Sequence, residues 1–347
     1  MEKRVTLRDI AEATGVHFTT VGLALRNDSR VKAATIAKVR AAARDLGYTH
    51  NAMLSALSAY RRNHQHRFAG TLAYVLNYKP EAYKGNLAET TLRSSLANYA
   101  KSQGFKLETF QITNPGMTGL QVSRILQARG IQGVLLSPRL PTPGPISDLE
   151  WGHFSTVAIG YSVTNVAAHR VCIHHAYNMR LCLRKLRERG YRRIGLVVLQ
   201  DFSERSHGIM LGSYLAEQYS LLASNRVTPL IPKELTKAAL GKWLKAQRVD
   251  CVIMPGYYVE IYDWIKKLGY NVPNEIGIGL ISRFGKSEDM AGIDEQNDLL
   301  GVAAGKSIVS LLQHNEHGLP EYPLYTMVEG RWVDGPSVRP LAIAARA

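Results

Sequence analysis

The residues whose types best fit a chemical task lie near the N-terminus, at the start of a short predicted helix. His17, Phe18 and Thr19 open this helix, and Gly22 follows on the same outward side. A helix that enters the major groove of DNA contacts base edges with residues near its own N-terminus. Hydrogen-bonding groups and an aromatic ring stand at that position here, so we expect these side chains to read base pairs.

Three short predicted helices position these residues. Thr6-Leu7-Arg8-Asp9 has the pattern of a capping box, which starts a helix, and Gly15 is placed to end it. The second helix spans about residues 17–26 and the third about residues 32–46. The third helix carries apolar residues at 4-3 spacing: Ile36, Val39, Ala43 and Leu46. Two short helices joined by a tight glycine turn predict a helix-turn-helix.

The distribution of charge favours a nucleic-acid partner for this segment. The chain has 347 residues, with 43 Lys and Arg against 28 Asp and Glu, a net charge of +15. Residues 1–67 hold 12 of the basic and 5 of the acidic residues, a net +7. The other 280 residues carry the remaining +8. A small basic module joined to a larger, more ordinary globular body is the simplest interpretation.

Three motifs near the N-terminus together indicate a family. They are Val5–Val16 with its Thr-Leu-Arg-Asp-Ile-Ala run, Thr20-Val21, and Leu46-Gly47-Tyr48 followed by Asn51-Ala52. In these motifs the chain resembles the LacI/GalR family of bacterial transcriptional regulators. The resemblance implies that the module binds one half-site of a DNA operator.

The expected DNA contacts fall into three groups. Base edges are read from the second helix, and phosphates or sugars are contacted by residues that set register. The resemblance adds a hinge segment, residues 51–57, in which a leucine matching Leu57 wedges into the minor groove. The full set is Thr6, His17, Phe18, Thr19, Thr20, Gly22, Leu23, Arg26, Arg30, Lys32, Thr35, Tyr48, Asn51, Leu54 and Leu57.

Two departures from the family pattern bear on the operator. Gly22-Leu23 stands where the family usually has Ser-Arg, and Arg26 stands where it usually has Asn. An apolar Leu23 cannot donate a hydrogen bond to guanine, although it can contact a thymine methyl group. We therefore expect an operator that differs from the common family half-site.

From residue 69 short apolar runs alternate with helical patterns, which predicts parallel sheets flanked by helices. About 275 residues is too much for one such core, so two lobes are expected. The predicted strands are Thr71–Asn77, Leu107–Ile112, Gly133–Ser137, Thr156–Gly160, Arg193–Leu199, Val227–Ile231, Cys251–Pro255 and Ile276–Ile281. The predicted helices are Leu87–Gln103, Leu120–Arg129, Asn178–Arg189, His207–Tyr219, Lys233–Ala246, Val259–Leu268 and Asp298–His314.

This body resembles the periplasmic-binding-protein-like domain of the same regulators, through Gly190–Ile194, Gln132–Leu136, Val272–Ile276 and Gly330–Val338. The domains expected are therefore an all-α helix-turn-helix domain (1–50), a hinge and linker (51–68), and a two-lobed α/β effector-binding and dimerisation domain (69–347). Ligands of such folds bind beyond the carboxyl ends of the strands, here between the lobes.

The candidate effector site departs from the sugar-binding members of the family. Gly256-Tyr257 and Ser282-Arg283 stand where those members carry Asn and Asp. We expect a cleft that has lost most acids, kept aromatic rings and cations, and binds simple sugars poorly. Three alternatives for its ligand stay open: a more aromatic or anionic molecule, a sugar stacked on tyrosine, or no tightly bound ligand. The expected site residues are Asn77, Tyr78, Ser137, Arg139, Tyr161, Arg205, Tyr257, Tyr258, Ser282 and Arg283.

No catalytic or metal-binding pattern is expected. His174 and His175 are adjacent and point in different directions on a strand, so the two do not chelate one ion, even with His169 nearby. Ser203 and Ser206 lack the Gly-x-Ser-x-Gly turn of a hydrolase. The three cysteines have no metal spacing and are expected to be reduced thiols. No apolar run reaches the length of a membrane span, and no signal-peptide core is present.

The sequence thus predicts a cytoplasmic, nucleoid-associated transcriptional regulator, a repressor, without cofactor, metal or membrane partner. It is expected to bind a palindromic double-stranded DNA operator as a homodimer. A small-molecule effector, either a carbohydrate or an anionic or aromatic metabolite, would control its DNA affinity. The runner-up is a ligand-independent regulator with a vestigial cleft. A transport binding protein and a sugar or nucleoside hydrolase are the alternatives from other classes.

Overall fold

The computed structural model describes residues 7–25, 28, 30–46, 70–76, 87–112, 118–138, 144–146, 148–283, 285–287 and 289–341. Its N-terminal part has three helices: α1 (Leu7–Thr14), α2 (Phe18–Leu25) and α3 (Ala33–Asp45). They confirm the three helices predicted from the sequence.

The N-terminal helices pack around a small core of their own. Ile10, Val21, Ala24 and Val39 are fully buried there. Gly15 has φ +66°, the left-handed conformation that a helix-ending glycine adopts readily, and so turns the chain between α1 and α2. One core prediction is wrong: Leu46, the residue that follows α3, is 39% exposed, because it lies beyond the last helical turn that faces the core.

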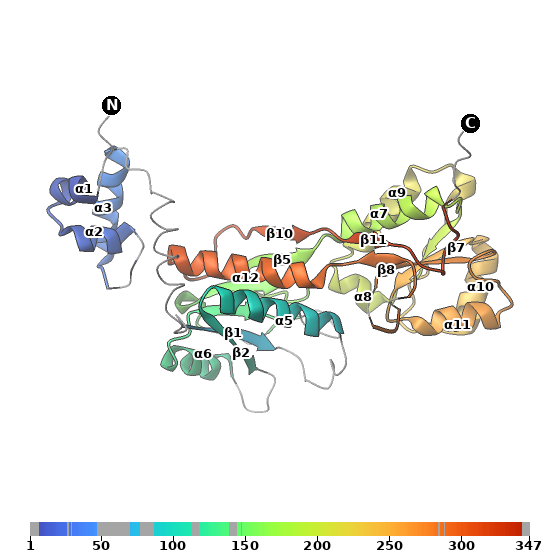
Figure 1. Cartoon of the computed structure of the whole chain (residues 1–347), viewed down its shortest axis with the longest axis horizontal. Coiled ribbons are helices and arrows are strands. Elements are labelled where there is room, and N and C mark those ends of the chain that lie inside the picture. Colours follow the sequence, from blue (N-terminus) through green and yellow to red (C-terminus); the bar gives the residue numbers. More distant parts are fainter. Residues whose placement is uncertain are drawn as a thin grey trace.

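The remaining residues form two lobes (Figure 1). The elements of the N-terminal lobe are β1 (Gly70–Leu76), α5 (Leu87–Ser102), β2 (Phe105–Gln111), α6 (Gly119–Ala128), β3 (Gly133–Leu136), η2 (Trp151–His153), β4 (Ser155–Ile159), β5 (His169–Ile173), α12 (Asn297–His314) and β10 (Tyr325–Val328). Its six strands are all parallel and lie in the order β10-β5-β4-β3-β1-β2. Helices α5 and α12 lie side by side on one face of this sheet (Figure 1).

The C-terminal lobe has a five-stranded sheet in the order β11-β9-β8-β7-β6, with only β11 antiparallel to its neighbour. Its elements are α7 (His175–Glu188), β6 (Ile194–Leu196), α8 (Gln200–Arg205), α9 (Ile209–Tyr219), η3 (Ala223–Asn225), α10 (Lys237–Gln247), β7 (Cys251–Pro255), α11 (Val259–Lys267), β8 (Gly277–Ser282), η4 (Gly285–Ser287), β9 (Gly292–Asp294) and β11 (Arg331–Val333). Helices α7 and α9 cover one face, and α10 and α11 the other.

The chain crosses between the lobes three times: from β5 to α7, from β9 to α12, and from β10 to β11. Hydrogen bonds tie these crossings together. The Gly330 amide donates to Oδ1 of the buried Asn178 (2.8 Å), and Gln296 Nε2 donates to the Glu329 carbonyl (2.7 Å). Because each bond joins two different crossings, the junction between the lobes is one connected unit.

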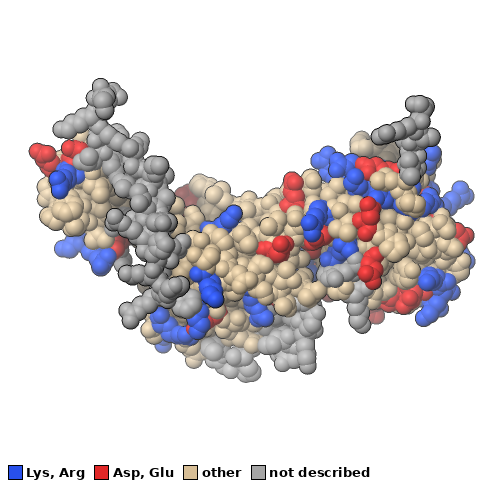
Figure 2. Space-filling model, in the orientation of Figure 1, with Lys and Arg blue, Asp and Glu red and all other residues tan. Residues whose placement is uncertain are grey.

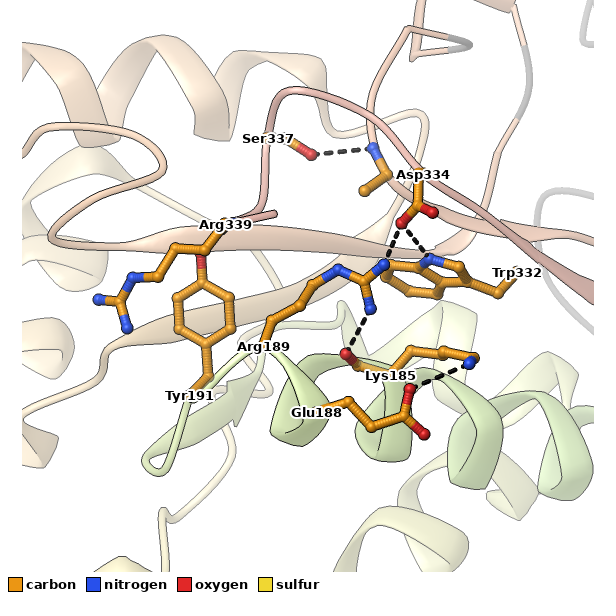
Figure 3. Close-up of polar contacts among 9 residues, drawn as sticks. Lys185, Glu188, Arg189, Tyr191, Trp332, Asp334, Ser337 and Arg339 are labelled. Atoms are coloured by element: carbon orange, nitrogen blue, oxygen red, sulfur yellow. Dashed lines mark hydrogen bonds and ion pairs between the residues drawn. The ribbon is translucent and has the colours of Figure 1, made fainter. Parts of the chain in front are cut away.

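The last described residues are fastened to the C-terminal lobe by a buried arginine (Figure 3). The Arg189 side chain, 2% exposed, donates to the Asp334 carboxylate and to the Lys185 carbonyl, and its guanidinium lies 5.1 Å from the centre of the Trp332 ring. The Trp332 indole N–H donates to the same carboxylate (2.8 Å). A buried charge needs such partners, so this cluster holds β11 and the chain after it against α7.

One predicted strand is wrong, and four observed strands were not predicted. Val227–Ile231 makes only a single bridge, between Val197 and Leu230, and forms no strand. The short strands β5, β9, β10 and β11 were not expected from the sequence. The predicted two-lobed α/β fold is nevertheless confirmed.

Candidate nucleic-acid interface and ligand cleft

Helix α2 presents the predicted base-reading residues to solvent. Phe18 is 44% exposed, and its ring lies 4.6 Å from the His17 ring, at an interplanar angle of 44°. His17 Nδ1 lies 2.8 Å from Thr19 Oγ1. This contact orients the imidazole and leaves Nε2 as the ring nitrogen available to an outside group. Thr20, Gly22 and Leu23 are half-buried.

The residues expected to contact phosphate lie just before and within α3. Arg30 is exposed, and its guanidinium makes two hydrogen bonds to the Asp28 carboxylate, at 2.9 and 2.8 Å. Lys32 is exposed and precedes α3 directly, whereas Thr35 is half-buried. The Asp28 partner was not expected from the sequence; it fixes the direction in which Arg30 points. The other DNA-contact predictions, Thr6, Arg26, Tyr48, Asn51, Leu54 and Leu57, lie outside the described residues.

A cavity of about 600 Å³ opens between the two lobes, beside their crossings. The N-terminal lobe contributes the start of α5 and the ends of β3 and β4, and the C-terminal lobe contributes α8, the start of α9, and the ends of β7 and β8. This is the position predicted for the ligand site. Much of the wall is apolar, formed by Leu92, Pro138, Ile159, Ile173, Phe202, Met210 and Leu300.

Four of the ten predicted effector residues line this cavity: Tyr161, Arg205, Tyr257 and Ser282. Ser137 is fully buried next to the lining residue Pro138. Asn77, Tyr78 and Arg139 lie outside the described residues.

Two of the expected effector residues do not line this cavity. Tyr258 does not line the cavity, because it belongs to the core of the C-terminal lobe, where its hydroxyl accepts from the Leu199 amide and contacts Tyr257 Oη. Arg283 is also directed elsewhere: its Nε donates to the Met290 carbonyl of its own lobe (2.7 Å). Tyr257 therefore lies between the cavity and Tyr258, and Ser282 is the residue of the second pair that lines the cavity.

The cleft contains two carboxyl groups that the sequence analysis missed, and this corrects the expectation of an acid-poor site. Glu89, at the start of α5, is 8% exposed and accepts a hydrogen bond from Tyr74 Oη (2.8 Å). Glu295, in the crossing from β9 to α12, lies with its Oε1 4.0 Å from Nδ1 of His175, the first residue of α7. Glu89 lies in the first turn of α5 and Glu295 in a crossing, and neither position is a strand end.

Burial keeps the His175–Glu295 pair mostly uncharged. It raises the pKa of Glu295 to about 8, although the nearby Arg205 guanidinium acts in the opposite direction. It lowers the pKa of His175 to about 3, helped by Arg205 and His174. A separation of 4.0 Å is too long for a hydrogen bond, and His175 Nδ1 has no hydrogen-bond partner among the described residues.

Aromatic rings border the polar groups of the cleft. The Tyr161 ring lies 5.6 Å from the His175 ring and 6.2 Å from the Tyr325 ring, which is stacked on it. Across the cleft Tyr257 makes an edge contact with Phe202 (5.3 Å), and the Arg205 guanidinium lies 4.9 Å from the Phe202 ring centre. Such walls suit a ligand with a flat or apolar face and a few hydrogen-bonding groups at one end.

The histidines considered for metal binding have structural contacts. His169 Nδ1 accepts from the Leu324 amide (3.0 Å), and His174 Nδ1 accepts from the Tyr177 amide (3.2 Å) and so caps α7. Among the described residues no three His, Cys, Asp or Glu side chains are grouped so that they could hold a metal ion. In the same part of the chain, no helix has the length and apolar character needed to cross a membrane.

Comparison with known proteins agrees with this architecture. Residues 6–51 match the model of a family described as "Bacterial regulatory proteins, lacI family". The chain matches no curated protein sequence.

Solved structures share the fold at low identity. One, the transcriptional regulator CelR in complex with cellobiose, has a TM-score of 0.56 at 17% identity, over 96% of this chain and 100% of that chain. The lac repressor dimer bound to operator and the anti-inducer ONPF gives 0.55 at 15%, over 97% and 100%. A periplasmic binding protein/LacI transcriptional regulator from Alkaliphilus metalliredigens QYMF, complexed with D-xylulofuranose, gives 0.53 at 13%, over 78% and 99%. At these identities the likeness concerns the fold.

Proposed function

We propose, from the match of residues 6–51 to the lacI family of bacterial regulatory proteins, that this chain is a transcriptional repressor controlled by a small molecule. Residues 1–50 would bind operator DNA, residues 51–68 would form the hinge, and residues 69–347 would bind the effector and dimerise. A homodimer would present two copies of α2 to a palindromic operator on double-stranded DNA. Its site of action would then be chromosomal DNA in the cytoplasm.

The observation that carries the DNA-binding part is the way α2 presents His17, Phe18 and Thr19. Phe18 exposes an aromatic ring beside the His17 ring, and the His17–Thr19 contact leaves the other imidazole nitrogen available to an outside acceptor or donor. Both features fit a base edge in the major groove, where Phe18 would lie against a thymine methyl group and His17 against a purine nitrogen or oxygen.

The observation that favours effector control is the composition of the cleft. It encloses about 600 Å³ and has buried polar groups from both lobes and from two crossings. Glu89, Arg205 and Glu295 could bond to hydroxyl groups of a ligand, while Phe202 and Tyr257 could cover its flat face. We therefore propose a polyhydroxylated effector with an aromatic or otherwise apolar part. Cellobiose and D-xylulofuranose are the ligands of two proteins with the same fold.

Ligand and DNA would be coupled through the arrangement of the two lobes. A ligand that contacts α5 on one side and α8 on the other has a higher affinity for one lobe arrangement than for another, which shifts the population of the two states. Since the crossings are joined by Asn178–Gly330 and Gln296–Glu329 hydrogen bonds, a ligand that shifts one crossing would shift the others with it and so change the angle between the lobes. The spacing of the two DNA-binding modules would follow.

The test has two parts. Binding-site selection with the full chain yields an operator, and its affinity is then measured by fluorescence anisotropy at several salt concentrations, with a fall of log K against log salt expected. A chain without residues 1–60 should lose operator binding. Retained binding by that truncated chain, or binding independent of salt, would contradict the proposal.

Effector control is tested on the same operator. Compounds that raise the Tm in a thermal-shift screen of sugars, aryl glycosides and aromatic acids are added to the anisotropy assay, alongside an Arg205→Met variant that lacks this guanidinium group in the cleft. We expect the active compound to change the affinity of the wild type for operator and to have little effect on the variant. A regulator with a vestigial cleft would instead bind operator with the same affinity in the presence of every compound.

A further inference from the structure

Helix α9 turns an apolar face to solvent. Its inner face is buried through Met210, Tyr214 and Gln218, whereas Gly212, Leu215, Ala216 and Tyr219 are exposed at the helical spacing i, i+3, i+4, i+7. Leu215 is 46% exposed, Tyr219 is 81% exposed, and Leu222, just beyond the helix, is 75% exposed. A solvent-facing surface helix normally shows the opposite pattern. An exposed apolar stripe of this kind is typical of a contact surface.

A row of arginines borders this stripe on the adjoining helix. Arg180, Arg184 and Arg187 follow at i, i+4, i+7 along α7, and the first two side chains are 73% and 63% exposed. Arg226 adds a charge at the far end, with its guanidinium 5.7 Å from the Tyr219 ring centre. Figure 2 shows basic side chains, with fewer acidic ones between them, over the lobe that carries these helices.

The arginines are only partly compensated by nearby carboxylates. Glu217 of α9 receives a hydrogen bond from Arg187 (2.8 Å) and a longer contact from Arg180 (3.6 Å). Glu188 accepts from Lys185 (3.0 Å) and lies 3.9 Å from Arg184. Arg187 Nη2 is buried and has no hydrogen-bond partner among the described residues. Arg180 and Arg184 are exposed and make only the longer contacts, so their guanidinium donors remain for an incoming carboxylate.

Between α7 and α9 the surface is hollowed into a groove of about 470 Å³. Tyr177 and Leu181 supply its apolar part, and the three arginines of α7, with Glu188 and Glu217, supply its charged edge. The groove and the apolar stripe are neighbours on one lobe face, which we call the α7–α9 face. A carboxylate directed into this groove would reach Arg187 while apolar side chains cover Leu215 and Tyr219.

A second copy of the chain fits this face poorly. Two copies packed across α9 in antiparallel orientation would place their arginine rows against each other, and a parallel arrangement would press the row of one copy onto Leu215 of the other. Residues 342–347, outside the described part of the chain, contain Arg346 and no acid, so they do not match this basic face. Nucleic acid would satisfy the arginines but leave Leu215, Tyr219 and Leu222 without an apolar partner.

We propose that the α7–α9 face binds another protein through an acidic amphipathic helix, whose apolar stripe covers α9 and whose carboxylates reach Arg180, Arg184 and Arg187. Gly212 and Ala216 let such a helix approach α9 closely, because neither has a side chain that would hold it away. This function is separate from operator and effector binding and depends on neither.

The probe is a fluorescein-labelled helical peptide of about five turns with leucine and alanine on one face and glutamate on the flanks, titrated with the full chain. Two control peptides have the same length: one carries lysine in place of glutamate, and one has the acidic sequence scrambled so that no face is apolar. We expect saturable binding of the amphipathic acidic peptide alone. Absence of saturation up to about 1 mM chain, or equal binding of either control, overturns the proposal.

Variants locate the binding surface. Arg180→Glu with Arg184→Glu should weaken binding at least about tenfold, which is the effect of losing two charge-assisted hydrogen bonds, and Tyr219→Ser should weaken it independently. If the charge reversal unfolds the lobe, the double variant Arg180→Gln with Arg184→Gln, which only removes the charges, replaces it in the binding assay. Arg124→Glu on the exposed side of α6 is the matched control and should bind as the wild type does. Unchanged binding by the α7 variants, or self-association abolished by Tyr219→Ser, would assign the face to a different occupant.

Discussion

The buried carboxyl of Glu295 should make the stability of the effector domain depend on pH. Its pKa rises from the ordinary 4.5 to about 8 because burial disfavours the charged form. Between these values the folded protein holds a proton that the unfolded chain has lost, so stability falls as pH rises from 4.5 and the loss is complete above about pH 8. Each unit of pKa difference corresponds to about 1.4 kcal/mol, so the shift from 4.5 to about 8 makes the full loss of unfolding free energy approach about 5 kcal/mol.

His175 acts at the other end of the pH range. Burial lowers its pKa from 6.5 to about 3, so the unfolded chain takes up a proton that the folded protein refuses, and stability falls as pH drops below 6.5. Between pH 4.5 and pH 6.5 the two contributions change in opposite directions and nearly cancel. The pair therefore predicts a plateau of stability over that interval, with a decline on either side.

The perturbation is Glu295→Gln, which keeps the shape of the protonated carboxyl and removes its titration. The free energy of unfolding is measured by urea denaturation at intervals from pH 4.5 to pH 8. We expect the variant to match the wild type at pH 4.5 and to become more stable than it as pH rises, by an amount approaching 5 kcal/mol at pH 8. Glu260→Gln, at an exposed position of α11, is the control and should keep the wild-type profile. Parallel pH profiles of wild type and Glu295→Gln would refute the reasoning.

Three shorter predictions concern the other parts of the molecule. Phe18→Ala should weaken operator binding about 10-fold to 100-fold, the range of a good base contact. In the same anisotropy assay its affinity for unrelated DNA should stay the same. An equal loss of affinity for both DNAs would argue against base reading. Gly301→Ala places a Cβ against the backbone of α5 and should destabilise the chain by about 1–3 kcal/mol. Gly212→Ala meets open space on α9 and should stabilise the chain by up to about 1 kcal/mol. The midpoints of urea denaturation measure both effects, and similar shifts for the two variants would contradict the prediction. Asp334→Ala leaves Arg189 buried with a lost partner and should cost about 1–3 kcal/mol, less than a fully buried pair because Asp334 is 71% exposed; an unchanged Tm would contradict it.

The sequence was most informative where one local signal decides the structure. Gly15 and the apolar spacing of three short helices predicted the N-terminal module, and strongly apolar runs such as Cys251–Pro255 predicted the central strands. Two of the four strands that were not predicted, β9 and β11, have only three residues each, and their place in the sheet is set by partners far along the chain. The strand predicted for Val227–Ile231 is wrong for the opposite reason: the segment is apolar, but it makes only one β-bridge, at Leu230.

The ligand cleft was predictable in position and only partly in composition. Strand ends supplied Tyr161, Tyr257 and Ser282, as expected for parallel sheets. Glu89 and Glu295 could not be found in this way, because one lies in the first turn of α5 and the other in a lobe crossing. Their approach to the cleft depends on how the two lobes pack, which no local pattern contains.

The three crossings between the lobes also constrain how the protein is made. Strand β10 and helix α12 complete the N-terminal lobe, yet they are encoded after the whole of β6–β9. During synthesis the sheet of β1–β5 must therefore wait, with the surface that Leu300, Ala304 and Ile308 later cover still exposed, until almost the entire chain has left the ribosome. Neither lobe is a contiguous stretch of sequence, so a chain interrupted between β6 and β9 would yield two incomplete lobes and not one finished lobe.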